Sequence, residues 1–244
     1  GFSVGTNFEY YDDLFFGLGN SNYYEKISTD ATASARQQAQ KGNYWDSFLN
    51  LNFTQDKRNR KFQTTKGYLS KYNLDIPIIS DTNSFINTFN YKYFSELYNE
   101  NVSTFGISLG SAFSLDDSDI KLSERLFIPS SRLRGFEGGK VGPKDGNDFV
   151  GGNYLATINF ASSIPQILPN SQDTDFSVFL DVANIWGVDY DSNLNDSGKV
   201  RSSIGIGLDW FTVIGPISFS YAQPLSKDTN DVIQEFRFNL GTTF

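Results

Sequence analysis

Apolar and polar side chains alternate residue by residue along much of the chain. Between residues 201 and 211, Ile204, Ile206, Leu208 and Trp210 share one parity, and small or acidic residues take the other. Successive side chains of a β-strand point to opposite faces, so this run predicts a strand with one apolar and one polar face. Similar runs predict about eleven strands. They lie at 2–10, 14–27, 47–53, 68–78, 85–93, 105–113, 153–160, 176–186, 201–211, 217–221 and 236–244.

The final predicted strand indicates what its apolar face contacts. That face consists of Phe236, Phe238, Leu240 and Phe244. A chain end usually frays in water, whereas a strand in the wall of a transmembrane barrel can end with an aromatic ring at the lipid boundary. Gly241 interrupts the strand, where a glycine often marks a bend. We therefore interpret the segment as a barrel strand that faces lipid and bends near its end.

The connectors between the predicted strands differ in length. Short connectors lie at 11–13, 80–82, 97–101 and 213–216, and long ones at 28–45, 115–148 and 187–200. Short turns at one end and long loops at the other are typical of membrane barrels. The pattern predicts an all-β fold, an antiparallel transmembrane β-barrel, with one short helix within 28–40 that Ser28 or Thr29 caps. A soluble β-sandwich produces the same alternation and stays as the alternative.

Composition removes several classes of function. The 244 residues include 20 Lys plus Arg, 28 Asp plus Glu, no His and no Cys. The formal net charge of −8 argues against a nucleic-acid surface. Without His or Cys, neither a Ser-His-Asp nor a Cys-His apparatus can form. A Ser-Lys or carboxylate-pair enzyme stays open, but no segment marks one. We expect no enzyme, no catalytic residues, no cofactor and no metal. The chain has no apolar run of about 20 residues for a membrane helix, and the residues after Gly1 lack the basic and apolar regions of a signal peptide.

The long connector 115–148 carries the most specific motif. Residues 129–142 read PSSRLRGFEGGKVG. The glycines permit tight turns with positive φ, and the connector holds too much Leu, Phe and Ile for a solvated tail. We interpret it as a loop folded back into the barrel lumen, where Phe136 packs and Arg134 meets a carboxylate.

Several segments resemble the BamA-type outer-membrane assembly factors. Leu133, Arg134, Gly135 and Phe136 are similar to that family's (V/I/L)RG(F/Y) motif. The segments GGNY at 151–154, FLDVANIW at 179–186 and GPISFSYAQP at 215–224 resemble the strands that follow it, in order, and the terminal strand completes the set. The resemblance is most specific from about residue 124 to the end of the chain.

The resemblance also implies partners for the motif. In that family the motif arginine lies inside the barrel and pairs with acidic residues on neighbouring inward faces. One acidic position falls at Asp181, which the alternation independently assigns to the lumen face. The other falls at Asn159, whose amide can accept a hydrogen bond from Arg134 but supplies no charge. We therefore expect Arg134 and Asp181 to form the main pair.

As a function, the resemblance implies a non-enzymatic insertase for β-barrel proteins, integral to the bacterial outer membrane. A lateral gate would open between the first and last strands. Its C-terminal lip would comprise Phe236, Phe238, Leu240, Gly241 and Phe244. Unfolded outer-membrane proteins would be the substrates, and the bilayer would contact the barrel. Accessory lipoproteins and periplasmic chaperones would bind through regions outside this chain.

The family barrel has roughly sixteen strands. Residues 1–244 are therefore expected to be its C-terminal part, with the periplasmic POTRA repeats absent. A polypeptide-secretion translocator of the same superfamily and a passive outer-membrane channel are the alternative functions.

Overall fold

The computed structural model describes residues 1–61, 63–81, 83–98, 100–116, 118–164, 173–188, 194, 198–212 and 215–240. Eleven strands form one antiparallel sheet in chain order. They are β1 (Phe2–Tyr11), β2 (Leu14–Ile27), β3 (Gly42–Asp56), β4 (Gly67–Pro77), β5 (Ser84–Tyr98), β6 (Asn101–Ser114), β10 (Tyr154–Ser163), β11 (Thr174–Trp186), β12 (Arg201–Thr212), β13 (Gly215–Ser226) and β15 (Phe236–Leu240). The predicted all-β fold is confirmed, with strands at the predicted places.

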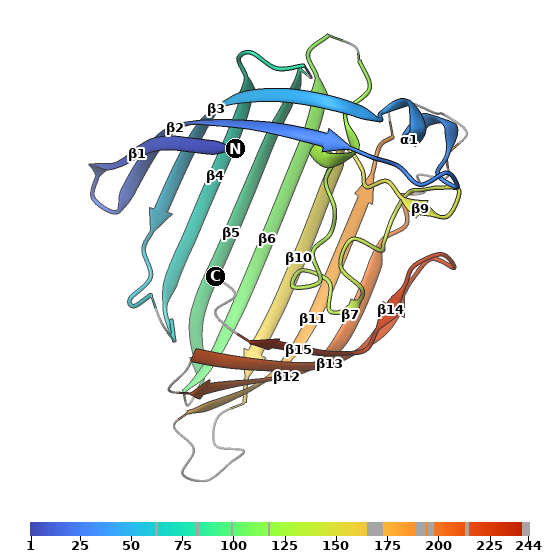
Figure 1. Cartoon of the computed structure of the whole chain (residues 1–244). Helices are drawn as coiled ribbons and strands as arrows, with labels where there is room; N and C mark the ends of the chain where they lie inside the picture. The colour runs from blue at the N-terminus through green and yellow to red at the C-terminus, as the bar shows by residue number, and fades with distance from the viewer. Residues whose placement is uncertain are drawn as a thin grey trace.

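The sheet curls around a central space, and β1 and β15 form its two edges (Figure 1). Each of these strands pairs with a single neighbour within the described residues, β1 with β2 and β15 with β13. Within the described residues, the sheet therefore ends at these two strands. No described helix is long and apolar enough to cross a membrane.

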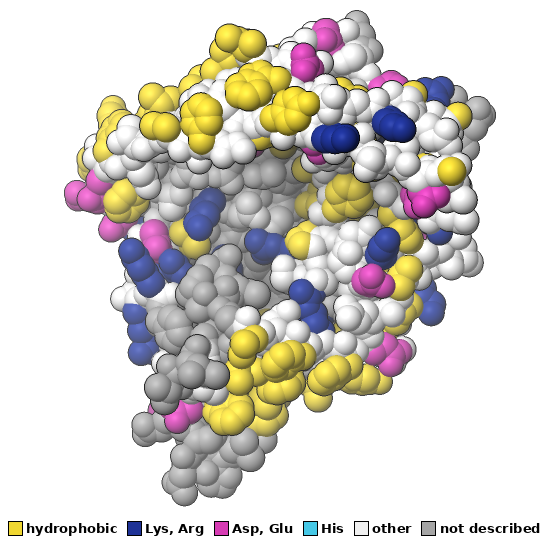
Figure 2. Space-filling view, viewed as in Figure 1, with side chains coloured by type: hydrophobic (Ala, Val, Ile, Leu, Met, Phe, Trp, Pro, Cys, Tyr) yellow, Lys and Arg dark blue, Asp and Glu magenta, His cyan; other side chains and the backbone are white. Residues whose placement is uncertain are grey.

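The apolar faces of the strands point away from the central space. On β11, Val178 and Leu180 are 40% and 39% exposed, whereas Phe179 and Asp181 on the opposite parity are buried. Figure 2 shows hydrophobic side chains gathered outside the upper strands and along the lower edge, with a hollow between them lined by polar and basic side chains. A β-sandwich would bury its apolar faces against each other, so this arrangement contradicts the sandwich alternative.

The longest connectors gather at one end of the sheet. Strand order places 28–41, 115–153, 187–200 and 227–235 at that end. The short connector 78–83 also lies there, and the opposite end holds the ten-residue connector 57–66. The connectors at one end of the sheet are therefore longer than those at the other, but less regularly than the sequence predicts.

The single predicted helix is shorter than expected. α1 spans Ala35–Ala39, and the Ser34 Oγ accepts a hydrogen bond from the Gln37 backbone N–H at 3.2 Å. The prediction of Ser28 or Thr29 as the cap is wrong. Asp30 accepts hydrogen bonds from the backbone N–H and the hydroxyl of Thr32, which hold the preceding residues in a turn.

The β6–β10 connector, residues 115–153, lies inside the curled sheet (Figure 1). It contains η1 (Leu122–Glu124) and the short strands β7 (Gly135–Phe136), β8 (Lys144–Asp145) and β9 (Asp148–Phe149). The main buried apolar cluster joins this connector to β11. Its members are Ile128, Leu133, Phe136, Val141, Ala183 and Ile185. The best-packed apolar region of the chain therefore lies on the inner side of the sheet.

Candidate functional site

The LRGF motif packs onto the inner faces of β11, β12 and β13. Leu133 and Phe136 are each 1% exposed and belong to the cluster with Ile185. Gly135 has a φ of +91°, and a Cβ there would lie 3.1 Å from the Cβ of Ala222. Both the backbone angle and the close approach require glycine at this position. The turn that follows Arg134 is thereby pressed against the sheet.

Arg134 makes a bidentate contact with Asp181 on β11. Its Nε lies 2.7 Å from Oδ2 and its Nη2 lies 2.7 Å from Oδ1. The backbone N–H of Arg134 donates to Oδ2 at 3.1 Å. Asp181 is fully buried and the Arg134 side chain is 22% exposed. A planar guanidinium matches a carboxylate in this geometry, so the contact fixes the orientation of the connector as well as neutralising the acid.

Asn159 on β10 also contacts the carboxylate, but as a donor. Its Nδ2 donates to Asp181 Oδ1 and to the Arg132 carbonyl oxygen, each at 2.8 Å. The expectation that Asn159 could accept a hydrogen bond from Arg134 is wrong. The amide nitrogen faces Asp181, and the buried Oδ1 of Asn159 has no partner among the described residues. Asn159 therefore helps to satisfy the buried acid, a task that a second carboxylate could not perform.

Phe179 forms a further contact that the sequence analysis missed. The Arg134 Cζ lies 3.3 Å from the centroid of its ring, and Phe179 is 2% exposed. A guanidinium over an aromatic face is stabilised by the ring quadrupole. Ser203 on β12 donates its hydroxyl to the Arg134 carbonyl oxygen. The parity shared by Phe179 and Asp181 was the available signal for this neighbour.

The motif is also hydrogen-bonded to the segment that leads into the last strand. β14 (Ile233–Gln234) pairs with β7, with Ile233 opposite Phe136 and Gln234 opposite Gly135. The Glu137 backbone N–H donates to the Val232 carbonyl oxygen at 2.9 Å. β15 begins two residues after β14. The position of the motif is thus linked to the start of the edge strand.

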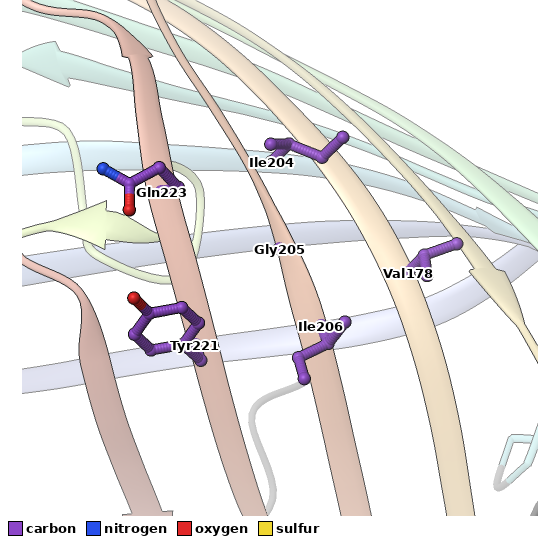
Figure 3. A pocket seen from close by; sticks show the side chains of 6 residues that line it. All are labelled: Val178, Ile204, Gly205, Ile206, Tyr221 and Gln223. Carbon is purple, nitrogen blue, oxygen red and sulfur yellow. The ribbon is translucent and has the colours of Figure 1, made fainter.

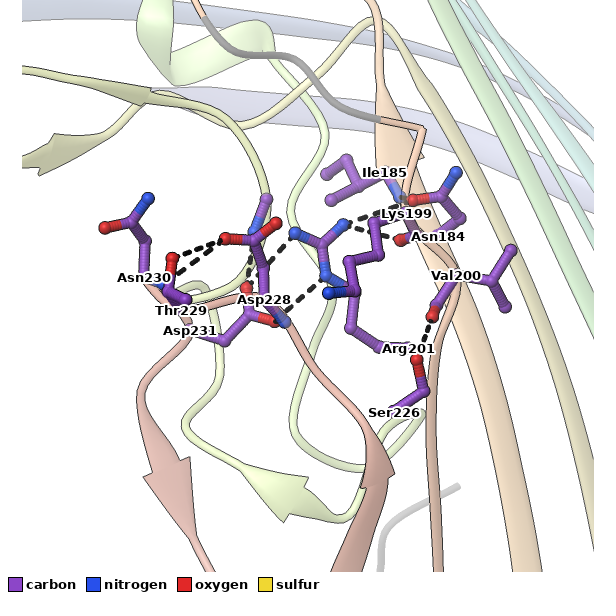
Figure 4. Close-up of polar contacts among 11 residues, drawn as sticks. Asn184, Ile185, Lys199, Val200, Arg201, Ser226, Asp228, Thr229, Asn230 and Asp231 are labelled. Carbon is purple, nitrogen blue, oxygen red and sulfur yellow. Dashed lines mark hydrogen bonds and ion pairs between the residues drawn. The ribbon is translucent and has the colours of Figure 1, made fainter.

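A second ion pair supports the same region (Figure 4). Arg201 Nε lies 3.0 Å from Asp231 Oδ2, and Arg201 Nη2 lies 3.2 Å from Oδ1. Both side chains are almost completely buried. The Gly142 backbone N–H approaches Asp231 Oδ1 at 3.4 Å. This pair, which the sequence analysis did not identify, holds the β13–β15 connector against β12 and the β6–β10 connector.

The apolar face of the terminal strand is directed outwards. Phe236, Phe238 and Leu240 are 60%, 52% and 65% exposed. Arg237 and Asn239, on the other parity, are partly buried and share a hydrogen bond at 3.1 Å. The predicted seam residues Gly241 and Phe244 lie outside the described residues. At the other edge, all ten residues of β1 are exposed.

A shallow hollow of about 300 Å³ lies on the outward face of β11–β13 (Figure 3). Val178, Ile204, Gly205, Ile206, Tyr221 and Gln223 line it. The lining has no carboxylate and no amine, so it offers no acid–base pair. Among the described residues, no group of three or more acidic side chains is arranged to hold a metal ion. The ion pairs of Arg134 and Arg201 hold strands and connectors in place.

Known proteins resemble this chain in sequence and in fold. A family model described as the Omp85 superfamily domain matches residues 1–244. The chain is 29% identical over 216 residues to the outer membrane protein assembly factor BamA of Neisseria meningitidis serogroup B. That match covers 74% of this chain and 26% of the relative, so the chain spans about a quarter of its length.

Two solved structures share the fold. The crystal structure of BamA from Haemophilus ducreyi lacking POTRA domains 1–3 matches with a TM-score of 0.84 at 25% identity, over 97% of this chain and 52% of that one. CdiB from Acinetobacter baumannii matches with a TM-score of 0.59 at 12% identity, over 98% of this chain and 41% of that one, which is a likeness of fold alone. The match to the family model extends from the first residue to the last, and the chain belongs to the Omp85 superfamily.

Proposed function

We propose that this chain forms part of the barrel wall of an assembly factor, which inserts β-barrel proteins into the outer membrane. The family and the apolar outer face place the chain in that membrane. The observation that carries the proposal is the curled antiparallel sheet with an apolar outer face, which matches the BamA structure over 97% of this chain. The similarity to BamA supports the assembly role. Residues 1–244 would be the C-terminal part of a larger barrel.

The proposed mechanism uses the backbone and needs no covalent step. An edge strand presents unpaired N–H and C=O groups, which can pair with an incoming strand. Lipid offers those groups no hydrogen-bond partner, so an opened edge gains stability by pairing. The seam between the first and last strands would open laterally, and a substrate strand would add there. Near this seam the wall would also thin the bilayer and lower the barrier to insertion.

In this mechanism the Arg134 site holds the barrel interior in a defined arrangement. Arg134 and Asp181 fix the β6–β10 connector on β11, and β7 pairs with β14 just before β15. The motif would therefore set the position from which the last strand moves. Unfolded outer-membrane proteins would be the substrates. Accessory lipoproteins and periplasmic chaperones would bind through other parts of the whole protein.

Reconstitution tests the proposal. The full-length protein that contains this chain is placed in liposomes, and an unfolded β-barrel substrate is added. We expect substrate to fold into these liposomes several times faster than into empty ones, and Arg134→Ala to remove most of the gain. Arg60→Ala removes an exposed arginine and serves as the control. No acceleration by a correctly folded protein would overturn the proposal.

The two alternative functions place a cargo in the lumen. A secretion translocator would pass a polypeptide through the barrel, and a passive channel would leave the interior open to solutes. The β6–β10 connector instead packs its apolar side chains on the inner face of β11. The fold likeness to CdiB does not separate these functions. Accumulation of substrate inside the liposomes, without insertion, would favour secretion.

A further inference from the structure

A second charged cluster joins the β6–β10 connector to the other side of the sheet. Lys121, at the start of η1, places its Nζ 2.6 Å from Asp46 Oδ2 on β3 and 2.9 Å from Glu25 Oε2 on β2. Glu124 Oε1 lies 3.2 Å away. The Lys121 side chain is 2% exposed and that of Asp46 is fully buried. One buried ammonium is thus shared by three carboxylates that come from two strands and the connector.

Aromatic rings and further hydrogen bonds surround this ammonium. Nζ lies 4.9 Å from the centroid of the Tyr44 ring and 5.9 Å from that of Tyr23. Burial opposes the positive charge, but hydrogen bonds to Asp46 and Glu25 outweigh it and raise the pKa of Lys121 above its ordinary value. The Ser123 hydroxyl also donates to Glu25 Oε2 at 2.9 Å. The cation is therefore held firmly and stays charged.

The register of β2 and β3 shows what the ammonium does for the sheet. Glu25 lies opposite Tyr44 and Tyr23 lies opposite Asp46, so the two acids are diagonal neighbours on adjacent strands. Like charges on neighbouring strands destabilise their pairing, the more so when they are buried. Lys121 sits between the two acids and removes this repulsion. The β2–β3 pairing therefore depends on a residue from the β6–β10 connector.

The same connector is also fixed to β11, through the pair of Arg134 with Asp181. Lys121 and Arg134 are thirteen positions apart, and the buried residues Ile128 and Leu133 lie between them. The connector thus links β2 and β3 with the strands that precede β15.

We propose that Lys121 is a positioning residue that latches β2 and β3 to the β6–β10 connector. Its ammonium neutralises Glu25 and Asp46, keeps β2 paired with β3, and so fixes the connector that carries Arg134. The consequence for insertion rests on the proposed function, in which the Arg134 site holds the barrel interior in a defined arrangement. The latch itself is a property of the folded chain.

Hydrogen–deuterium exchange of the reconstituted protein tests the latch. Lys121→Gln should speed amide exchange in β2 and β3 at least tenfold, with β11 and β12 unchanged within threefold. Lys140→Gln, an exposed lysine of the same connector, should change neither region. Adding Glu25→Gln to Lys121→Gln removes one of the three carboxylates, which lessens the repulsion and should restore part of the lost protection. A merely space-filling role for Lys121 predicts no such rescue.

The outcomes separate the latch from the proposed function. Unchanged exchange in β2 and β3, an equal increase in every strand, or no rescue in the double variant overturns the latch. Should Lys121→Gln fail to fold, recovery of folded protein in the double variant is the expected result, and its failure to recover overturns the latch. Insertion measured on the same samples supports the link to assembly if its rate changes with exchange. If the unmodified protein shows no insertion activity, that result contradicts only the proposed function.

Discussion

Truncating Arg134 to alanine should release the β6–β10 connector from β11. Breaking a fully buried ion pair costs about 3–5 kcal/mol. Arg134 is 22% exposed, and Asp181 would keep hydrogen bonds from Asn159 and from the backbone N–H of residue 134, so the lower part of that range applies. With the contact to Phe179 included, which adds about 1 kcal/mol, we expect a loss of about 3 kcal/mol. That free energy corresponds to a roughly 100-fold larger population of the released connector.

Amide exchange in the connector measures this population. The Glu137 N–H, bonded to Val232, and the Gly139 N–H, bonded to Ile128 at 3.0 Å, report whether the connector is in place. Arg134→Ala should raise their exchange rates by roughly 100-fold. Arg134→Lys should give an intermediate increase, because an ammonium cannot make the bidentate and stacked contacts together.

An exposed arginine provides the matched control for this prediction. Arg60→Ala should leave the exchange of both connector amides within threefold of the unmodified protein. An increase below threefold in Arg134→Ala would refute the reasoning, since the pair would then contribute little to holding the connector. An equal increase in the amides of β3 and β4 would also refute it, because the effect would then be global.

Other substitutions test separate parts of the structure. Asp181→Asn removes the charge and should speed exchange of the same connector amides at least tenfold, as charged hydrogen bonds contribute about 1.5–3 kcal/mol. Gly135→Ala forces a Cβ into a backbone with φ of +91° and should destabilise the connector by about 1–2 kcal/mol, measured by the same exchange. Ile206→Arg puts a charge on the outward face and should lower the free energy of unfolding in liposomes by about 2–4 kcal/mol, whereas Ile206→Leu should change it by less than about 1.5 kcal/mol. Arg201→Gln removes the bidentate partner of Asp231 and should speed exchange across 227–235, and unchanged exchange there would show that the pair is dispensable.

The strands were predictable because their signal is local. Alternation of apolar and polar residues follows directly from the geometry of a strand, and it assigned Asp181 to the inner face before any contact was known. The same parity placed Phe236 and Phe238 outside, where the structure has them. It was harder to predict whether the apolar face of each strand points outwards or into a core, since a β-sandwich and a membrane barrel share the alternating pattern. The exposure of the apolar side chains distinguishes the two folds.

The contacts made by the long connector could not be predicted in the same way. Lys121 and Asp46 are 75 positions apart, and no periodicity relates a loop residue to a strand residue at that separation. Arg201 and Asp231 present the same difficulty. The prediction of Ser28 or Thr29 as the helix cap was wrong for a local reason. The turn at Asp30 competes with a helix that would start earlier in the chain. Asn159 was placed on the correct face, but its role as a donor depends on which atom of the amide faces Asp181.

Crosslinking to a substrate during assembly tests the central claim most directly. A photo-crosslinker is placed at Asn7 on β1, at Asn239 on β15, at the partly buried Asn73 on β4, and at Ile158 on the outward face of β10. A β-barrel substrate stalled during insertion should crosslink at Asn239, on the last strand, at least tenfold more than at the other three positions. Crosslinks concentrated at Asn7 or Asn73, or equally frequent at Ile158, would contradict strand addition at the last strand of the barrel.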